Sequence, residues 1–144
     1  MKIDTRIMDE IEISPEDIIS FKDGLLGLEG FRDYVLLELP QNDKFLCLQS
    51  IEDPGLAFFV AHPWDFFPEY EADVPDKELE DIGITSPDQL SLYCILTVPV
   101  EIREITANLL APIIIGGEKN EGKQVVLVET EYKTKHRLFP EKEV

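Results

Sequence analysis

Residues 34–61, which read YVLLELPQNDKFLCLQSIEDPGLAFFVA, give the clearest indication of the fold. Its three apolar runs are rich in β-branched and aromatic residues, as half-buried strands are; they are residues 34–39, 45–51 and 56–61. The polar residues 41–44, and Asp53-Pro54-Gly55 further on, have the composition of tight turns. Because short connections join neighbouring strands, the stretch predicts a three-stranded antiparallel meander.

Five further apolar runs flank the meander and predict more strands; they are residues 2–7, 18–21, 92–98, 110–115 and 124–128. In the first run Ile3, Thr5 and Ile7 alternate, so we expect them on one face. The last two runs enclose a glycine-rich polar loop, residues 116–122, and are expected to pair as a hairpin. The predicted fold class is mainly β, a single-domain antiparallel barrel-like or strongly twisted sheet.

Residues 63–89 interrupt this pattern with four prolines, which remove backbone donors and exclude a central strand. One or two short helices are expected in this excursion. The first covers residues 76–82, with Asp76 capping its start and Gly83 ending it. The second is a single turn that begins at Ser86, with Gln89 completing a capping box.

Charge and length narrow the class of protein. Thirteen Lys and Arg stand against thirty Asp and Glu, which gives a net charge of −17. Such a field disfavours direct nucleic-acid binding and attracts a basic protein, although the acids alone also fit a solvated face. The 144 residues predict one domain over residues 1–140 and a loose charged tail over 141–144.

The sequence also predicts a compartment and a redox state. It begins without the apolar stretch of a signal peptide, and it has no run of about 18 apolar residues. We therefore expect a cytoplasmic protein without membrane association. Cys47 and Cys94 lie far apart inside apolar runs, so we expect buried, reduced thiols.

Reactive residue types form no recognisable catalytic or metal pattern. His62 and His136 are the two histidines, and they supply too few ligands for zinc, so neither a metal nor a cofactor is predicted. Asp65 could orient His62, yet no serine lies in a nucleophile elbow, and we expect structural roles for both histidines. Carboxylate pairs arise by chance among thirty acids, which leaves a small acidic-cleft enzyme of unknown reaction as the alternative function.

The glycine-rich residues 24–30, GLLGLEG, lack the residue order of a phosphate-binding loop. We expect instead a tight turn in which Gly24 or Gly27 has a positive φ.

Residues 64–71, WDFFPEYE, place four aromatic rings beside carboxylates in a proline-constrained loop. Rigid rings next to charges are typical of protein-binding anchors, although rings also cap cores. We expect exposed anchors at Trp64 and Tyr70, and core contacts for Phe66 and Phe67. The acidic run that follows is a candidate docking field or a solvated helix face. The partner-binding candidates are Trp64, Asp65, Glu69, Tyr70, Glu71, Asp76, Glu78 and Glu80.

Four strings in a fixed order carry a family resemblance. They are FKDGLLGLE (residues 21–29), LQSIEDPGLAF (48–58), HPWDFFPEY (62–70) and NLLAP (108–112). Together they resemble the flagellar assembly factor FliW family from about Ile3 to about Leu138. Within the strings we expect structural roles for Gly24, Gly27, Pro54, Asn108 and Pro112. Gly116 departs from the family pattern, in which Asn is common, and we expect it in a hairpin turn that tolerates positive φ.

The resemblance implies a function that composition does not. FliW-like proteins are cytoplasmic, lack enzymatic activity and bind flagellin before its secretion. They also bind the RNA-binding translational repressor CsrA, and flagellin that occupies the factor frees CsrA to repress flagellin synthesis. The expected partners are therefore flagellin and CsrA, with no nucleic acid bound directly, and the free protein is expected to be a monomer.

Overall fold

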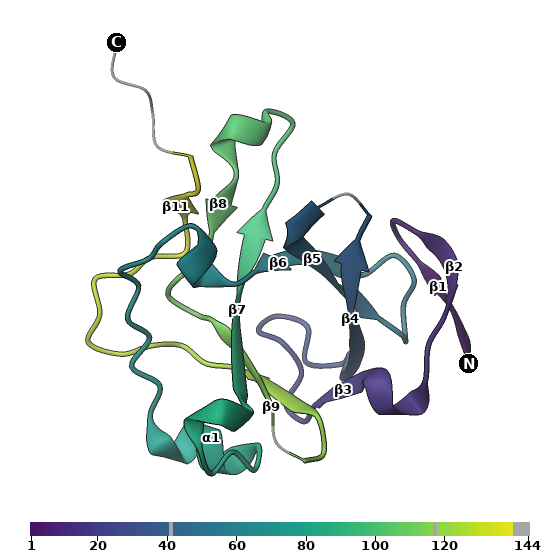
Figure 1. Ribbon diagram of the computed structural model, residues 1–144, viewed down its shortest axis with the longest axis horizontal. Coiled ribbons are helices and arrows are strands. Elements are labelled where there is room, and N and C mark those ends of the chain that lie inside the picture. Colours follow the sequence, from purple (N-terminus) through teal and green to yellow (C-terminus); the bar gives the residue numbers. More distant parts are fainter. Residues whose placement is uncertain (41, 117, 140–144) are drawn as a thin grey trace.

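Seven strands close into a barrel in the computed structural model, which describes residues 1–40, 42–116 and 118–139 (Figure 1). The barrel order is β3-β4-β5-β6-β7-β9-β10, and it closes because β10 pairs with β3. That one seam is parallel, whereas the other pairings are antiparallel. The strands are β3 Ile18–Phe21, β4 Asp33–Leu39, β5 Asn42–Ser50, β6 Ala57–Ala61, β7 Leu90–Thr97, β9 Ile113–Gly116 and β10 Glu121–Gln124. The mainly β, barrel-like fold expected from the sequence is confirmed.

The remaining elements attach to this barrel. Beyond β7 the sheet continues through β8 Thr106–Ala107 to β11 His136–Arg137, and β1 Lys2–Thr5 pairs with β2 Asp9–Glu12 in a separate hairpin. One α-helix, α1 Asp76–Asp81, lies in the long excursion between β6 and β7. The 3-10 turns are η1 Pro15–Asp17, η2 Pro63–Asp65, η3 Pro87–Gln89 and η4 Ile102–Glu104.

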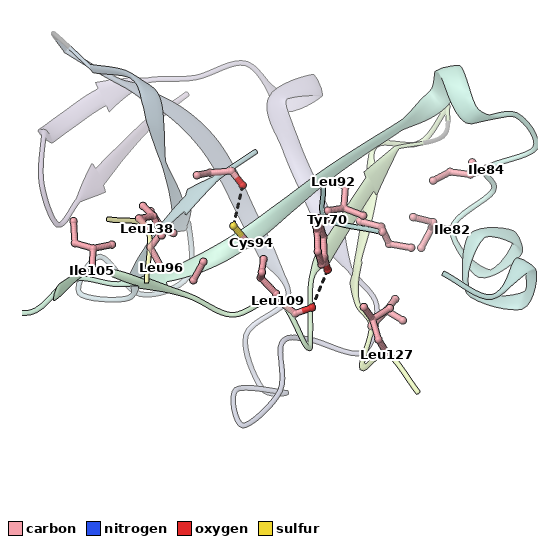
Figure 2. Close-up of a cluster of buried hydrophobic side chains, with 14 residues drawn as sticks. Tyr70, Ile82, Ile84, Leu92, Cys94, Leu96, Ile105, Leu109, Leu127 and Leu138 are labelled. Atoms are coloured by element: carbon pink, nitrogen blue, oxygen red, sulfur yellow. Dashed lines mark hydrogen bonds between the residues drawn. The ribbon is translucent and has the colours of Figure 1, made fainter. Parts of the chain in front are cut away.

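Strand β7 is covered on both faces because its side chains alternate between two apolar clusters. Tyr93 and Ile95 pack with Phe21 and Tyr34 in one cluster. Leu92, Cys94 and Leu96 belong to the other, which also contains residues from the excursion and from the segments after β7 (Figure 2). Both cysteines are buried free thiols, as predicted, and the Cys94 Sγ lies 3.5 Å from the backbone oxygen of Ala61.

The meander expected from residues 34–61 is confirmed as β4-β5-β6. Its second turn is closed by Asp53, whose Oδ1 accepts the Gly55 N–H at 2.9 Å, while its backbone oxygen accepts the Leu56 N–H at 3.0 Å. Pro54 occupies this turn, as expected. In the first connection the sequence predicted a loop from residue 41 to 44, but β5 already begins at Asn42, and Gln41 lies outside the described residues.

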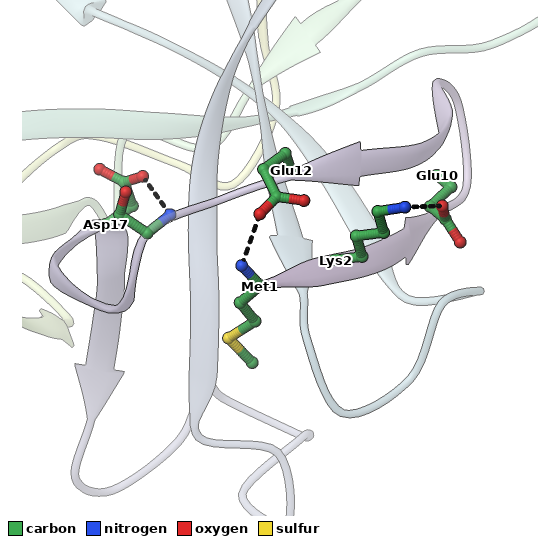
Figure 3. Close-up of polar contacts among 6 residues, drawn as sticks. Met1, Lys2, Glu10, Glu12 and Asp17 are labelled. Carbon is green, nitrogen blue, oxygen red and sulfur yellow. Dashed lines mark hydrogen bonds and ion pairs between the residues drawn. The ribbon is translucent and has the colours of Figure 1, made fainter.

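A buried amide joins the turn to the N-terminal hairpin. Gln49 has no exposed surface, and its Nε2 donates to the backbone oxygens of Ser50, Pro54 and Leu56. Its Oε1 accepts the Arg6 N–H at 3.0 Å. The hairpin carries its own surface ion pairs, from the Met1 amino group to Glu12 at 2.7 Å and from Lys2 to Glu10 at 3.8 Å (Figure 3). Gln49 therefore attaches the hairpin to the barrel by buried hydrogen bonds, whereas the exposed ion pairs act only within the hairpin.

Two predicted strands are shifted in the structure. The first ends at Thr5, so Ile3 and Thr5 are buried as expected but Ile7 lies in the following turn with 44% of its surface exposed. The last lies at Glu121–Gln124, so residues 125–128 fall after the strand and part of the predicted loop is the strand. The reason is Gly122: a Cβ there would lie 2.6 Å from the Phe21 ring, so the glycine serves close packing inside a strand.

The predicted hairpin between these last two strands is confirmed, with Glu121 opposite Gly116. The prediction that Gly116 lies in the hairpin turn with a positive φ was wrong. Gly116 is the last residue of β9, and its φ is not positive. A Cβ at this position would lie 2.1 Å from the Gln89 backbone oxygen. Close approach of two backbone segments explains this glycine, and the predicted β9 start at residue 110 moves to Ile113.

The excursion contains the short helices that the sequence predicted. Helix α1 begins after Pro75, so Asp76 is its first helical residue and not its cap. It ends at Asp81, and Gly83 follows with φ +75°, where the Gly83 and Ile84 amides donate to the Glu80 and Leu79 oxygens. The turn at Ser86 is η3, and the Gln89 Oε1 accepts the Ser86 N–H at 3.3 Å. The predicted loose tail, residues 141–144, lies outside the described residues, and no helix among those described is long and apolar enough to cross a membrane.

Candidate partner-binding surface

We call residues 64–71 the aromatic loop. It begins in the turn η2, which follows β6. Trp64 lies in this turn with 45% of its surface exposed, and its Nε1 donates a hydrogen bond to the Tyr70 backbone oxygen at 2.8 Å. The hydrogen bond satisfies the polar edge of the indole and leaves nearly half of the side chain in solvent. Trp64 thus has the exposure of a protein-binding anchor.

Tyr70 differs from the exposed anchor expected from the sequence. Only 4% of its surface is accessible, and its hydroxyl donates to the Leu109 backbone oxygen at 2.8 Å (Figure 2). Its ring lies 4.7 Å from that of Tyr132, and burial raises the pKa of its hydroxyl. Tyr70 therefore belongs to the core, because residues distant in sequence close over it.

Phe66 and Phe67 are half-buried and pack against the same core cluster, in keeping with the core contacts expected of them. The Phe66 ring lies 5.6 Å from the Phe45 ring, and the Phe67 ring lies 6.1 Å from the imidazole of His136. The loop is thus attached to β5 and β11 as well as to its own neighbours, so its exposed side chains are held on a fixed support.

The predicted acidic field lies in solvent, with one exception. Asp65, Glu69, Glu71, Asp76 and Glu80 are exposed. Glu78 is partly buried and forms an ion pair of 2.7 Å with Lys123 of β10, which also contacts Asp81 at 2.7 Å. The Lys123 hydrogen bond lowers the pKa of Asp81. Lys123, which the sequence analysis did not single out, therefore ties α1 to the barrel and neutralises part of the field.

The glycine turn has the positive φ values that the sequence predicted, at Gly24 (+68°) and at Gly27 (+80°). The Leu28 N–H donates to the Leu25 oxygen at 2.8 Å, which closes the turn and leaves Leu26 55% exposed at its tip. A side chain at Gly24 would meet the Glu29 backbone at 2.6 Å, whereas nothing lies within 4 Å of a Cβ at Gly27. Both glycines are structural, and Gly24 is the more constrained.

The string at residues 108–112 is structural as well. The Asn108 Oδ1 accepts the Leu110 and Ala111 amides at 3.1 and 3.0 Å, and the Pro112 oxygen accepts the Val125 N–H at 2.9 Å. Lys133 supplies its backbone oxygen to the Leu109 and Leu110 amides. The string thus links the segment before β9 to the segments that follow β10.

A further network, centred on Glu52, was missed from the sequence. Its Oε1 accepts the Arg32 and Asp33 amides at 2.6 and 2.7 Å, and these backbone hydrogen bonds lower the pKa of the carboxyl group. The Ser50 Oγ accepts the Glu52 and Asp53 amides at 3.0 Å. The sequence contains one signal for this network, namely acidic and hydroxyl side chains beside a predicted turn, where such side chains often form hydrogen bonds with the backbone.

The groups with strongly raised pKa values are buried side chains of the core. Burial raises the pKa of Tyr34 and of Cys94 to about 12. His136, which lines a surface hollow, uses its Nε2 to accept the Lys133 N–H at 2.8 Å, and burial lowers its pKa. His62 is exposed, with its ring 4.6 Å from that of Tyr93. Among the described residues no cluster of three His, Cys, Asp or Glu could hold a metal ion.

Comparisons with known proteins agree with this geometry. A family model described as FliW protein matches residues 2–138. The flagellar assembly factor FliW of Geobacillus thermodenitrificans is 46% identical over 142 residues, which cover 99% of this chain and 98% of the relative. That of Syntrophomonas wolfei is 38% identical over 96% of this chain and 89% of its own. A crystal structure of the flagellar assembly factor FliW, 45% identical, matches with a TM-score of 0.93 over 99% of this chain and 100% of the other. The chain therefore belongs to the FliW family.

Proposed function

We propose that this chain is a non-enzymatic flagellar assembly factor that acts in the cytoplasm as a partner switch. It binds flagellin and the RNA-binding translational repressor CsrA, and bound flagellin frees CsrA to repress flagellin translation. The observation that carries the proposal is the full-length match to proteins named flagellar assembly factor FliW, in sequence and in structure. The free protein is proposed to be a monomer that binds neither nucleic acid nor membrane directly.

The charge distribution supports CsrA as one partner. A protein that binds RNA must present basic surface, and this chain carries a net charge of −17. Residues 45–76 contain no Lys or Arg, and within them Asp65, Glu69 and Glu71 are exposed beside Trp64. An acidic rim around an exposed ring suits a basic partner with an apolar contact.

The experiment is the rate of association with purified CsrA as a function of salt. We expect the association rate constant to fall several-fold between about 0.05 and about 0.3 M salt, because the Debye length shrinks from about 14 to about 6 Å. The quadruple variant Glu69→Gln, Glu71→Gln, Asp76→Asn and Glu80→Gln should associate more slowly and with a weaker salt dependence.

The matched control neutralises four exposed acids of the N-terminal elements, Asp4→Asn on β1, Asp9→Asn and Glu10→Gln on β2, and Glu16→Gln on η1. It should associate nearly as the parent does. A rate that is flat across the salt range, or an equal loss in both variants, would show that this acidic surface does not steer CsrA.

A further inference from the structure

A surface hollow of about 550 Å³ lies where the aromatic loop meets the segments that follow β10. We call it the aromatic pocket; its walls include Phe66, Phe67, Glu69, Tyr70, Tyr132 and His136. The volume is within the range of sites that hold a small molecule or a large side chain. Its walls come from three parts of the chain, residues 66–70, Leu109 and residues 132–136, so folding creates it.

The rings of the pocket are held in place before any ligand arrives. Tyr70 is fixed by its hydrogen bond to Leu109, and the Tyr132 hydroxyl accepts the Glu71 N–H at 3.0 Å. The His136 imidazole is fixed through its Nε2 by the Lys133 N–H. The Tyr132 ring lies 4.7 Å from Tyr70 and 5.9 Å from His136. A group that enters meets preorganised aromatic faces, so little ordering of the protein opposes binding.

The chemistry of the walls selects for an apolar group beside a positive charge. Aromatic faces attract both apolar groups and cations, and Glu69, an exposed acid, is one of the residues that line the pocket. The chain itself shows this preference, because the Lys44 Nζ lies 5.8 Å from the centre of the Phe66 ring. Lys133 lies near His136 and is a positive charge close to the pocket. The aromatic loop carries more negative charges than this one positive charge of Lys133; they are Asp65, Glu69 and Glu71.

We propose that the aromatic pocket binds one aromatic or large aliphatic side chain of a partner protein, flanked in that partner's sequence by Lys or Arg. The occupant's ring packs among Phe67, Tyr132 and His136, and its flanking cation meets Glu69. This inference rests on the proposed function in one respect, that the occupant belongs to a protein.

The test measures how three blocked tripeptides bind to the unmodified full-length protein. Acetyl-Lys-Phe-Lys-amide carries both features, acetyl-Lys-Ala-Lys-amide lacks the ring, and acetyl-Glu-Phe-Glu-amide reverses the charge. Binding is followed by amide chemical shifts and by the fluorescence of Trp64, the single tryptophan, whose ring lies 6.2 Å from that of Tyr70. We expect saturable binding of the first peptide with a dissociation constant of about 1–10 mM, as its size allows. The other two peptides should bind at least about fivefold more weakly.

Variants locate the site on the protein. Glu69→Gln should weaken the Lys-Phe-Lys peptide about threefold, whereas Glu10→Gln, an exposed acid on β2, should change binding little. Tyr132→Ala removes a wall and should abolish saturation, while Tyr132→Phe keeps the ring and should bind as the parent does. The urea midpoint of Tyr132→Ala shows whether this variant is still folded, which separates loss of the wall from loss of folding.

The pocket proposal is overturned if no peptide saturates, if Lys-Ala-Lys binds as well as Lys-Phe-Lys, or if the shifted amides lie away from residues 66–70 and 132–136. The proposed function fails separately, if the chain binds the peptide at this site yet neither flagellin nor CsrA.

Discussion

The indole N–H of Trp64 donates to the backbone oxygen of Tyr70 at 2.8 Å, although 45% of the first side chain is exposed and only 4% of the second. Two rings six residues apart in one loop therefore have different physical roles. Trp64 presents an aromatic face to solvent from a fixed position. Tyr70 holds the loop to the barrel through Leu109.

Truncating the two rings should separate binding from stability. Trp64→Ala is expected to leave the free energy of unfolding nearly unchanged and to weaken partner binding by about 2 kcal/mol. Tyr70→Ala should lower the free energy of unfolding by about 3–5 kcal/mol, because it leaves a cavity in the core. Urea denaturation and titration with flagellin and with CsrA check both variants. Normal affinity of Trp64→Ala for both partners would remove Trp64 from the binding surface.

Two tyrosine hydroxyls should respond to deletion with opposite signs. The Tyr34 hydroxyl is buried without a hydrogen-bond partner among the described residues, whereas that of Tyr70 donates to Leu109. Tyr34→Phe should therefore be neutral or stabilising by up to about 1 kcal/mol, and Tyr70→Phe should destabilise by about 1 kcal/mol. The measurement is the urea midpoint of each variant. A clear loss of stability in Tyr34→Phe would mean that its hydroxyl is satisfied in solution.

The glycine turn predicts unequal costs at its two positive-φ positions. Gly27→Val should destabilise by about 1–3 kcal/mol, because a branched side chain must adopt φ near +80°. Gly24→Val should cost more, since its Cβ would also collide with the Glu29 backbone. Thermal and urea unfolding compare them, with Gly30→Ala as a control position that has open space. Equal stability of the Gly24 and Gly27 variants would contradict the clash.

The Glu52 network predicts a pH-dependent contribution to stability. Two backbone hydrogen bonds lower the pKa of this carboxyl group in the folded state, so its contribution is present above the unfolded pKa of about 4.3. The contribution is lost as the pH falls through the lower, folded pKa. Glu52→Gln should therefore destabilise most near pH 7 and progressively less below about pH 4. Exposed Glu131→Gln is the control, and a Glu52→Gln difference that does not shrink on acidification would contradict this role.

The strands that could be predicted from sequence were those with local signals. The β4-β5-β6 meander has apolar runs of strand length joined by turn residues, and Asp53 closes its turn by contacts within three residues. Gly24 and Gly27 could also be assigned to a turn because their spacing fits it. Such signals lie within a few residues of one another.

What the sequence did not reveal depends on contacts between distant residues. Gly122 resembles a loop residue until it is placed against Phe21, so β10 was assigned too late in the chain. The two-residue strands β8 and β11 have no periodicity to detect, and they exist because each pairs with a neighbour. Tyr70 looked exposed beside its acidic neighbours because Leu109 and Tyr132, which cover it, are about forty and sixty residues away.

One titration examines the partner switch itself: the protein, and then flagellin, are added to CsrA bound to a labelled RNA from a flagellin transcript. Fluorescence anisotropy of the RNA reports how much CsrA remains bound. We predict that the protein lowers the anisotropy by releasing RNA, and that flagellin added next restores it by occupying the protein. An RNA that stays bound when the protein is added, or stays free after excess flagellin is added, would contradict the switch.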